Sequence, residues 1–204
     1  MNKLLLRMDR LRILPGRKEP PADEQRSNMD EYYGDGGFDF LYSLEELSHY
    51  MVILGYIRYF ARQPAILDVG CGEGRLAELL DRQDYKDYHG IDISPIAIQR
   101  AQKKKLPEMR FTVTDFQTWD PDRSYDLIIF CESLYYVQQP QKVIQYYAPS
   151  LKKDGHVIIS IYRFLDQERI WDGIDQGFKF CAGDTVQNLR GTWDIRVYAP
   201  WNAG

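Results

Sequence analysis

Three glycines alternate with other residues in a short segment that follows a stretch of apolar residues. The segment reads D-V-G-C-G-E-G-R over positions 68–75, with glycine at 70, 72 and 74. Glycine permits a tight turn with positive φ and lets the backbone come close to a ligand. The dinucleotide-binding fingerprint G-x-G-x-x-G would place its third glycine at position 75, where this chain has arginine. The spacing therefore favours a ligand-binding loop that does not hold a dinucleotide pyrophosphate.

Two acidic residues follow the next two predicted strands at similar places. Asp92 stands in G-I-D-I-S, 22 residues after Gly70, and Asp115 stands in T-D-F. An acid at the end of the strand after a glycine loop can accept hydrogen bonds from ribose hydroxyls. Because open α/β sheets bind ligands at the carboxyl ends of their strands, we expect Asp68, Asp92 and Asp115 to line one site.

Strands and helices must position these residues. From position 64 onward, short apolar runs typical of strands alternate with segments of helical periodicity. A continuous apolar run such as residues 125–130 (Y-D-L-I-I-F) is typical of a strand covered on both faces. The last two runs flank Arg190-Gly191 and predict an antiparallel hairpin. The pattern predicts a doubly wound, mostly parallel α/β sheet with one reversed strand at its edge. The expected strands are residues 65–70, 88–93, 110–114, 125–130, 156–162, 185–189 and 193–198, and the expected helices are 74–82, 95–105, 141–151 and 166–178.

The first 40 residues differ from the rest, because Pro-Gly, Pro-Pro and Gly-rich stretches interrupt them. They predict a partly flexible arm and a glycine-flanked loop that carries the aromatic residues Tyr32, Tyr33, Phe38 and Phe40. Residues 41–204 are the expected catalytic domain. Ser43 and Glu46 form a capping-box pattern that predicts a helix to about residue 60, packed over this domain. The apolar face expected for this helix comprises Leu44, Leu47, Met51, Leu54, Ile57 and Tyr59.

Taken together, D-V-G-C-G-E-G, I-D-I-S and T-D-F resemble the motifs of class I S-adenosylmethionine-dependent methyltransferases. The likeness covers residues 65–198, including the hairpin, which supplies the reversed strand in that family. It implies a seven-stranded Rossmann-like sheet, with S-adenosylmethionine as cofactor and S-adenosylhomocysteine as product. By this resemblance, Asp68, Gly70 and Gly72 contact the amino acid end of the cofactor and Asp92 the ribose. Asp115 contacts the adenine amine, Phe116 lies beside the ring and Cys131 lies below the cofactor; the other cofactor-binding candidates are Cys71, Gly74, Ile93 and Tyr33.

The acceptor side is less marked in the sequence. Methyl transfer from a sulfonium is an in-line displacement, so positioning and desolvation are the protein's main tasks. Arg163 leaves the fifth strand on the cofactor side and could hold a carboxylate or phosphate bidentately, or be a surface arginine. Tyr136 is the second candidate for acceptor binding. We take His89 and His156 as structural, because both lie early in their strands. The candidate catalytic residues, any of which could instead serve packing or cofactor contact, are Glu132, Tyr135, Tyr136 and His49.

The composition of the chain limits the classes of binding partner that can be expected. The formal net charge of −4 argues against nucleic acid as the main partner. The cysteines Cys71, Cys131 and Cys181 form no C-x-x-C pair, which predicts a reducing, cytoplasmic compartment and no metal site. No run approaches the length of a membrane span, so no membrane partner is expected. We expect a monomer or homodimer that acts on a small molecule.

The segment E-S-L-Y-Y-V at positions 132–137 resembles the small-molecule branch that includes the nodulation N-methyltransferases. The favoured hypothesis is a methyltransferase for a hydroxyl or amine of a sugar or secondary metabolite, as in natural product biosynthesis. Two alternatives stay open. One is a protein or RNA methyltransferase that uses the basic residues among positions 3–18 as a docking arm, and the other is a cofactor-binding subunit without catalysis of its own.

Overall fold

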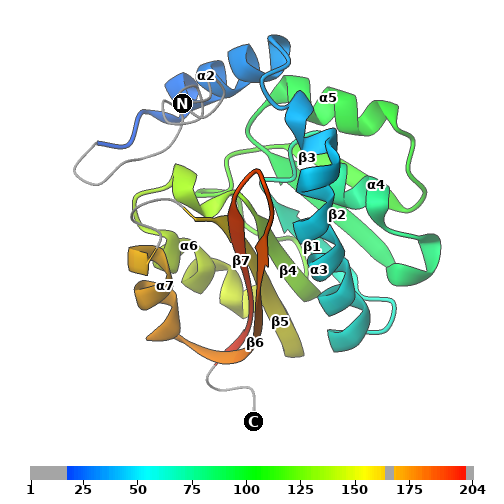
Figure 1. Ribbon diagram of the computed structural model, residues 1–204, viewed down its shortest axis with the longest axis vertical. Coiled ribbons are helices and arrows are strands. Elements are labelled where there is room, and N and C mark those ends of the chain that lie inside the picture. The colour runs from blue at the N-terminus through cyan, green and yellow to red at the C-terminus, as the bar shows by residue number, and fades with distance from the viewer. Residues whose placement is uncertain (1–17, 164–167, 201–204) are drawn as a thin grey trace.

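A seven-stranded sheet with the order β3-β2-β1-β4-β5-β7-β6 organises the computed structural model, which describes residues 18–163 and 168–200 (Figure 1). β7 pairs antiparallel with both β5 and β6, and the other pairs are parallel. The predicted fold class is confirmed. The reversed strand is not at the edge, however, because β7 returns beside β5 and leaves β6 outermost. The strands are β1 (Ala65–Val69), β2 (Asp87–Asp92), β3 (Met109–Val113), β4 (Tyr125–Cys131), β5 (Leu151–Tyr162), β6 (Phe178–Gln187) and β7 (Thr192–Pro200).

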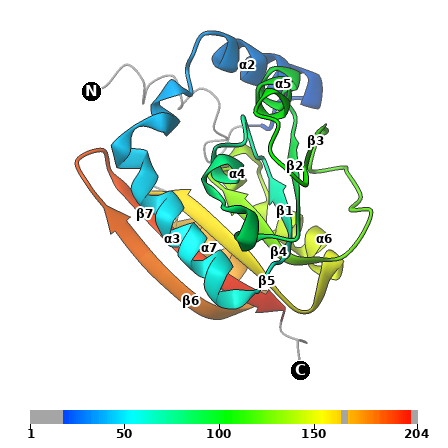
Figure 2. The same ribbon diagram turned by 90° about the vertical axis from the view of Figure 1, so that its right-hand side faces the viewer.

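Helices cover both faces of the sheet (Figure 2). α3 (Leu44–Phe60), α4 (Arg75–Leu79) and α5 (Pro95–Lys103) lie on one face, and α6 (Pro140–Tyr147) and α7 (Glu168–Asp175) pack together on the other. Alternate residues of β4 therefore enter different cores: Leu127 packs in the cluster of α3, whereas Ile128 packs in the cluster of α6 and α7. Burial on both faces explains why the strand reads as a continuous apolar run.

The connection from β3 to β4 differs from the others. Within the described residues 114–124 the chain forms turns and no helix, so the regular alternation of strand and helix is interrupted there. Short 3-10 turns occur elsewhere: η1 (Asp39–Tyr42), η2 (Arg82–Asp84), η3 (Leu134–Tyr136) and η4 (Ala148–Ser150). None of the helices in residues 18–163 and 168–200 is long and apolar enough to cross a membrane.

A helix precedes the domain where the sequence predicted an arm and loop. α2 (Ala22–Gly34) begins after Pro21 and lies across the end of the molecule where the parallel strands finish (Figure 1). Tyr32 and Tyr33 are therefore helical and buried, so the prediction of a loop at these positions is wrong. Asp30 fixes α2 to the start of α5, because its carboxylate accepts hydrogen bonds from the Ser94 hydroxyl and the Ile96 backbone N–H.

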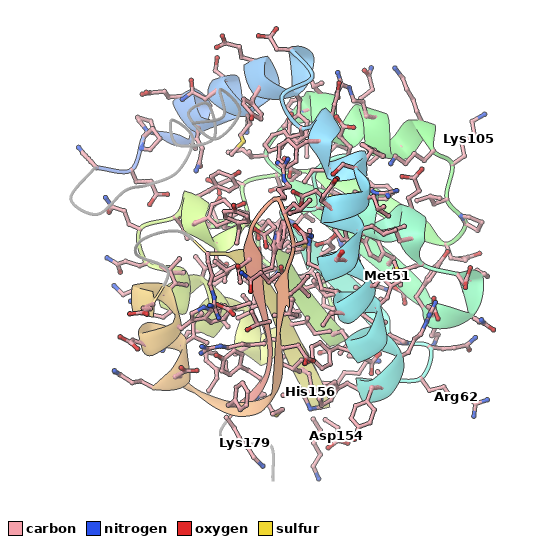
Figure 3. The ribbon with its side chains drawn as sticks, in the orientation of Figure 1. Met51, Arg62, Lys105, Asp154, His156 and Lys179 are labelled. Atoms are coloured by element: carbon pink, nitrogen blue, oxygen red, sulfur yellow. The ribbon has the colours of Figure 1, made fainter. Side chains whose placement is uncertain are left out.

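The helix predicted over residues 43–60 is confirmed as α3, and Leu54 and Ile57 of its predicted face are buried, but the rest of that face is not. Leu44, Met51 and Tyr59 are exposed, and Figure 3 shows Met51 on the outer side of α3. Polar residues take part in the buried face instead, which a search for apolar periodicity does not find. Ser43 precedes the helix, yet its side chain makes no capping hydrogen bond. The buried residues of α3 are Glu46, His49, Tyr50, Ile53, Leu54 and Ile57.

Candidate functional site

A cavity of about 330 Å³ opens at the carboxyl ends of β1, β2 and β4. Segments from α2, η1, α3 and the turn between β6 and β7 complete its walls. His156, which was expected to be structural, lies at the opposite end of the sheet (Figure 3). The predicted site residues that line the cavity are Tyr33, Asp68, Gly70, Cys71, Gly72, Asp92, Ile93, Asp115, Phe116, Cys131, Glu132, Tyr135 and Tyr136.

The glycine loop between β1 and α4 has the backbone that its sequence predicts. Gly70, Gly72 and Gly74 have φ values of 79°, 54° and 73°, in the left-handed region that favours glycine. A Cβ atom on Gly70 would lie 2.5 Å from the Ser133 Cβ, and one on Gly72 would lie 2.6 Å from the Tyr33 hydroxyl oxygen. Any side chain at Gly70 or Gly72 would therefore collide with a residue of the cavity wall. Gly74 lies outside the cavity, where a Cβ would press on the α5–β3 packing, so its place is that of a packing residue at the start of α4.

Asp68 is a buried acid at the end of β1 with one oxygen engaged and one without a partner. Its Oδ2 accepts a hydrogen bond from the Tyr88 hydroxyl, whereas its buried Oδ1 has none among the described residues. Burial raises the pKa of Asp68 to about 7. A buried acceptor without a partner is costly, so this atom fits a cationic donor such as the amino group of a methionine-type ligand.

Asp92 holds the glycine loop in place while it faces the cavity. The Gly72 backbone N–H donates to Oδ2 at 2.9 Å, and the Ser94 backbone N–H donates to Oδ1 at 2.9 Å. Burial raises its pKa to about 6, although both N–H groups favour the ionised form. Asp115 and Phe116 follow β3, and Asp115 accepts the Gln117 N–H at 2.9 Å. These acids have lone pairs left for ribose hydroxyls and an adenine amine.

Glu132 stands directly after β4 in an unusual backbone conformation. Its φ is 57°, a region that residues other than glycine seldom adopt and that clusters at functional sites. The Ser160 hydroxyl donates to its Oε1 at 2.6 Å, and the Tyr162 backbone N–H donates to its Oε2 at 2.9 Å. Burial raises the pKa of Glu132 to about 7, so the carboxyl group changes protonation near neutral pH. The Tyr135 hydroxyl lies 3.4 Å from Oε2.

Besides Gly74, two candidates for the acceptor side, His49 and Arg163, lie outside the cavity. His49 is fully buried behind the wall and stacks on Trp193 with 5.2 Å between ring centroids. Arg163 forms a two-pronged ion pair with Asp194, with Nε–Oδ2 and Nη2–Oδ1 distances of 2.8 and 2.7 Å. His49 and Arg163 therefore cannot contact a ligand in this cavity, contrary to the catalytic role expected for His49 and the acceptor-binding role expected for Arg163.

Sequence reasoning missed a second set of lining residues. Gln25 and Met29 line the cavity from α2. This helix has four buried positions at helical spacing, but one of them is polar, so the apolar pattern was not recognised. Other missed lining residues come from α3 and the hairpin, where the capping-box and turn patterns indicate structure and not a site. Among them are Glu46, Tyr50, Leu189, Arg190 and Trp193.

The doubly wound sheet with its reversed strand and the glycine loop followed by acids on successive strands define a class I S-adenosylmethionine-dependent methyltransferase. The chain belongs to the family described as methyltransferase domain, whose pattern it matches over residues 49–180. The predicted class and cofactor are thereby confirmed.

Curated relatives resemble about half of the chain. It is 27% identical over 110 residues to a malonyl-[acyl-carrier protein] O-methyltransferase of Paenibacillus sp. JDR-2, covering 50% of this chain and 40% of that protein. It is 35% identical over 116 residues to a ubiquinone biosynthesis O-methyltransferase of Pectobacterium atrosepticum, covering 52% and 47%. The chain thus spans less than half the length of these relatives.

Solved structures agree over more of the chain. The N-methyltransferase NodS from Bradyrhizobium japonicum WM9, in complex with S-adenosyl-L-homocysteine, superposes with a TM-score of 0.69 at 19% identity, covering 82% of this chain and 93% of that one. Magnesium protoporphyrin IX methyltransferase from Synechocystis PCC 6803, with bound S-adenosylmethionine, gives 0.71 at 17% identity, covering 92% and 100%. At such identities the likeness shows the fold.

Proposed function

We propose that this chain transfers the methyl group of S-adenosylmethionine to a hydroxyl or amine of a small molecule, a secondary metabolite or sugar. The observation that carries the proposal is the composition of the cavity. One set of walls comes from the glycine loop and the acids after β1, β2 and β3, and the other comes from aromatic residues of α2, α3 and the hairpin. A single cavity therefore combines a wall suited to a methyl donor with a wall suited to an acceptor. One relative is named a malonyl-[acyl-carrier protein] O-methyltransferase and another a ubiquinone biosynthesis O-methyltransferase. These names support a small-molecule acceptor.

The cofactor half would be held by the three acids. When bound, S-adenosylmethionine supplies a methyl group on a positively charged sulfur, which is a good leaving group. Asp68 Oδ1 would accept from the amino group, Asp92 from the ribose hydroxyls and Asp115 from the adenine amine. Cys71, Ile93, Phe116 and Cys131 would contact the cofactor through their apolar atoms, because all of them line the same cavity.

Glu132 is the proposed proton acceptor on the acceptor side. Its raised pKa suits a group that takes a proton from a hydroxyl or ammonium near neutral pH. Ser160 and Tyr162 hold both carboxylate oxygens in place, so the base is oriented before an acceptor binds. Tyr135 and Tyr136 line the same wall and would orient the acceptor, because burial and an ordinary phenol pKa near ~10 make tyrosine a poor base.

α2 is proposed as a lid over this cavity. Met29 and Tyr33 line the cavity from α2, and the Gln25 side chain donates to the Tyr136 backbone carbonyl at 2.8 Å. These contacts join α2 to the loop after β4, so the bound methyl donor would be shielded from water. Protection from proteolysis between Arg26 and Tyr42 on addition of S-adenosylhomocysteine is expected, and equal cleavage with and without it would contradict the lid.

The function is tested by incubating the chain with S-adenosylmethionine carrying a labelled methyl group and a cell extract, which is then separated into small molecules, RNA and protein. We expect label in a low-molecular-weight product, and its loss with Glu132→Gln. Asp154→Gln provides the matched control, since Asp154 is exposed at the far end of the sheet (Figure 3). Label found in RNA or protein, and not in small molecules, would favour the alternative acceptors. Cofactor binding without transfer to any fraction would favour a subunit without catalysis of its own.

A further inference from the structure

An ion pair joins α3 to the hairpin turn in the wall of the cavity. Arg190 Nε donates to Glu46 Oε1, and both residues line the cavity. The Glu46 side chain is 3% exposed, whereas the Arg190 side chain is 22% exposed. The Arg190 guanidinium also lies over the Phe40 ring, 4.0 Å from its centroid, which holds the planar group in a fixed orientation. A charged pair in a wall that is otherwise largely aromatic calls for a physical reason.

Fastening the hairpin does not supply that reason. The Asn188 side chain donates to the Glu45 backbone carbonyl at 2.8 Å, and the Tyr162 hydroxyl donates to the Arg190 carbonyl at 3.0 Å. These bonds tie the turn to α3 and to β5 without the Arg190 side chain. Burying a carboxylate and a guanidinium together adds little net stability, because desolvation offsets the attraction.

Glu46 has a second neighbour, besides Arg190, that can hold its carboxylate. His49 Nδ1 lies 3.7 Å from Glu46 Oε2 and makes no hydrogen bond within the described residues. Burial lowers the pKa of His49 to about 3, so its ring is neutral. The Cys131 Sγ lies 4.0 Å from Nε2. If this thiol donates to Nε2, the ring proton stands on Nδ1 and faces Glu46.

We propose that Arg190 anchors the acceptor, and that the acceptor carries a carboxylate on a flat apolar body. This inference rests on the proposed function and adds the chemical class of the substrate. The acceptor carboxylate replaces Glu46 on the guanidinium fork, a geometry suited to planar two-pronged binding, and Glu46 turns to His49. Phe40 lies against the Arg190 guanidinium, Tyr50 and Trp193 lie against His49, and all three rings line the cavity. The other cation of the described lining, Arg75, is engaged by Glu78 at 3.3 Å.

The test measures ligand binding by calorimetry on the full chain saturated with S-adenosylhomocysteine. The probes are benzoate, benzamide and benzylamine, which share a ring and differ in charge. We expect benzoate to bind about tenfold more tightly than benzamide, as a charge-assisted pair would give. Arg190→Gln should remove this preference, and Arg190→Lys should keep part of it, because lysine keeps the charge and loses the fork. Arg196→Gln is the matched control, since Arg196 lies on β7 and pairs with Asp175 at 2.9 Å.

Glu46→Gln gives the sharper result, because the two explanations differ in sign. If Glu46 competes with the acceptor for Arg190, its neutralisation strengthens benzoate binding. If the ion pair only shapes the wall, the same substitution leaves benzoate binding unchanged or weakens it, and that overturns the inference. Equal binding of benzamide, tighter binding of benzylamine, or no binding of benzoate would also overturn it.

S-adenosylhomocysteine binding is measured first for the wild type and each variant. Failure of the wild type to bind it contradicts the proposed function itself. Normal binding without any preference for benzoate contradicts the Arg190 anchor alone.

Discussion

The two halves of the cavity are built in different ways. In the proposed cofactor half, each acid lies at or just after the carboxyl end of a strand, and the strands are register neighbours: Asp68 pairs with Gly90, and Asp92 pairs with Val113. In the acceptor half, the wall comes from α2, α3, the loop after β4 and the hairpin turn, which are distant in the sequence. Sheet register therefore fixes the first half, whereas packing between separate segments fixes the second.

The difference extends to electrostatics. Backbone N–H groups orient the Asp92 carboxylate, so its place is set by the main chain. On the opposite wall, Glu46 and Arg190 orient each other through their side chains, and Glu132 accepts from one side chain, the Ser160 hydroxyl, and one backbone group, the Tyr162 N–H. We therefore expect substitutions in the cofactor half to remove binding of the donor, and substitutions in the acceptor half to change selectivity or proton transfer.

The largest effect is expected for Gly72→Val. Valine at a φ of 54° is strained, and its Cβ would lie 2.6 Å from the Tyr33 hydroxyl. We expect S-adenosylhomocysteine binding to fall below detection by calorimetry, while circular dichroism shows a folded chain. Gly55→Val is the control, because nothing lies within 4 Å of the Cβ position on the surface of α3. Normal binding by the Gly72 variant would mean that the loop does not face the cofactor.

A smaller loss is expected for Asp92→Asn, which keeps the shape of the side chain and removes its charge. Loss of a charged hydrogen bond to the ribose costs about 1–3 kcal/mol, which corresponds to roughly 5- to 150-fold in the dissociation constant. Titration of S-adenosylhomocysteine into the variant measures this change. Asp154→Asn, at the far end of the sheet, should bind like the wild type. Unchanged affinity in a folded Asp92 variant would exclude the ribose contact.

The raised pKa of Glu132 predicts how the free energy of unfolding depends on pH. Its pKa is about 7 in the folded chain against an ordinary value of 4.5, so folding binds a proton between these values. The contribution of Glu132 to the unfolding free energy should therefore be largest below about pH 4.5 and fall as the pH rises to about 7. Asp68 and Glu46 have raised pKa values of about 7 as well and add to the same slope. Urea denaturation from pH 4.5 to 8 should show a shallower fall for Glu132→Gln than for the wild type; an identical slope would contradict a buried, protonated Glu132.

The smallest effect is expected from metal removal. No group of three or more His, Cys, Asp or Glu side chains in the described part of the chain is arranged to hold a metal ion. The sulfonium donor needs no Lewis acid, so methyl transfer should keep its rate in EDTA. Loss of activity that magnesium or zinc restores would contradict this expectation.

The sequence predicts the cavity wall at the strand ends better than the wall formed by α2, α3 and the hairpin. Gly70, Gly72 and Asp92 are visible from spacing alone, because strand ends in a parallel sheet meet at one edge. Arg190 carries no local signal, since its role depends on how a hairpin turn meets α3. α3 shows the problem most clearly: Met51 fits an apolar pattern yet is exposed, whereas Glu46 is polar yet buried. Apolar periodicity does not identify a helix face that lines a polar site.

A crystal structure with S-adenosylhomocysteine tests the central claim most directly. The account predicts the ligand along the glycine loop, with its amino group on Asp68 Oδ1, its ribose hydroxyls on Asp92 and its adenine beside Phe116. The space between its sulfur and Glu132 should stay open for an acceptor. A ligand bound elsewhere, or one that fills the aromatic half and leaves Asp68 and Asp92 without contact, would contradict the account.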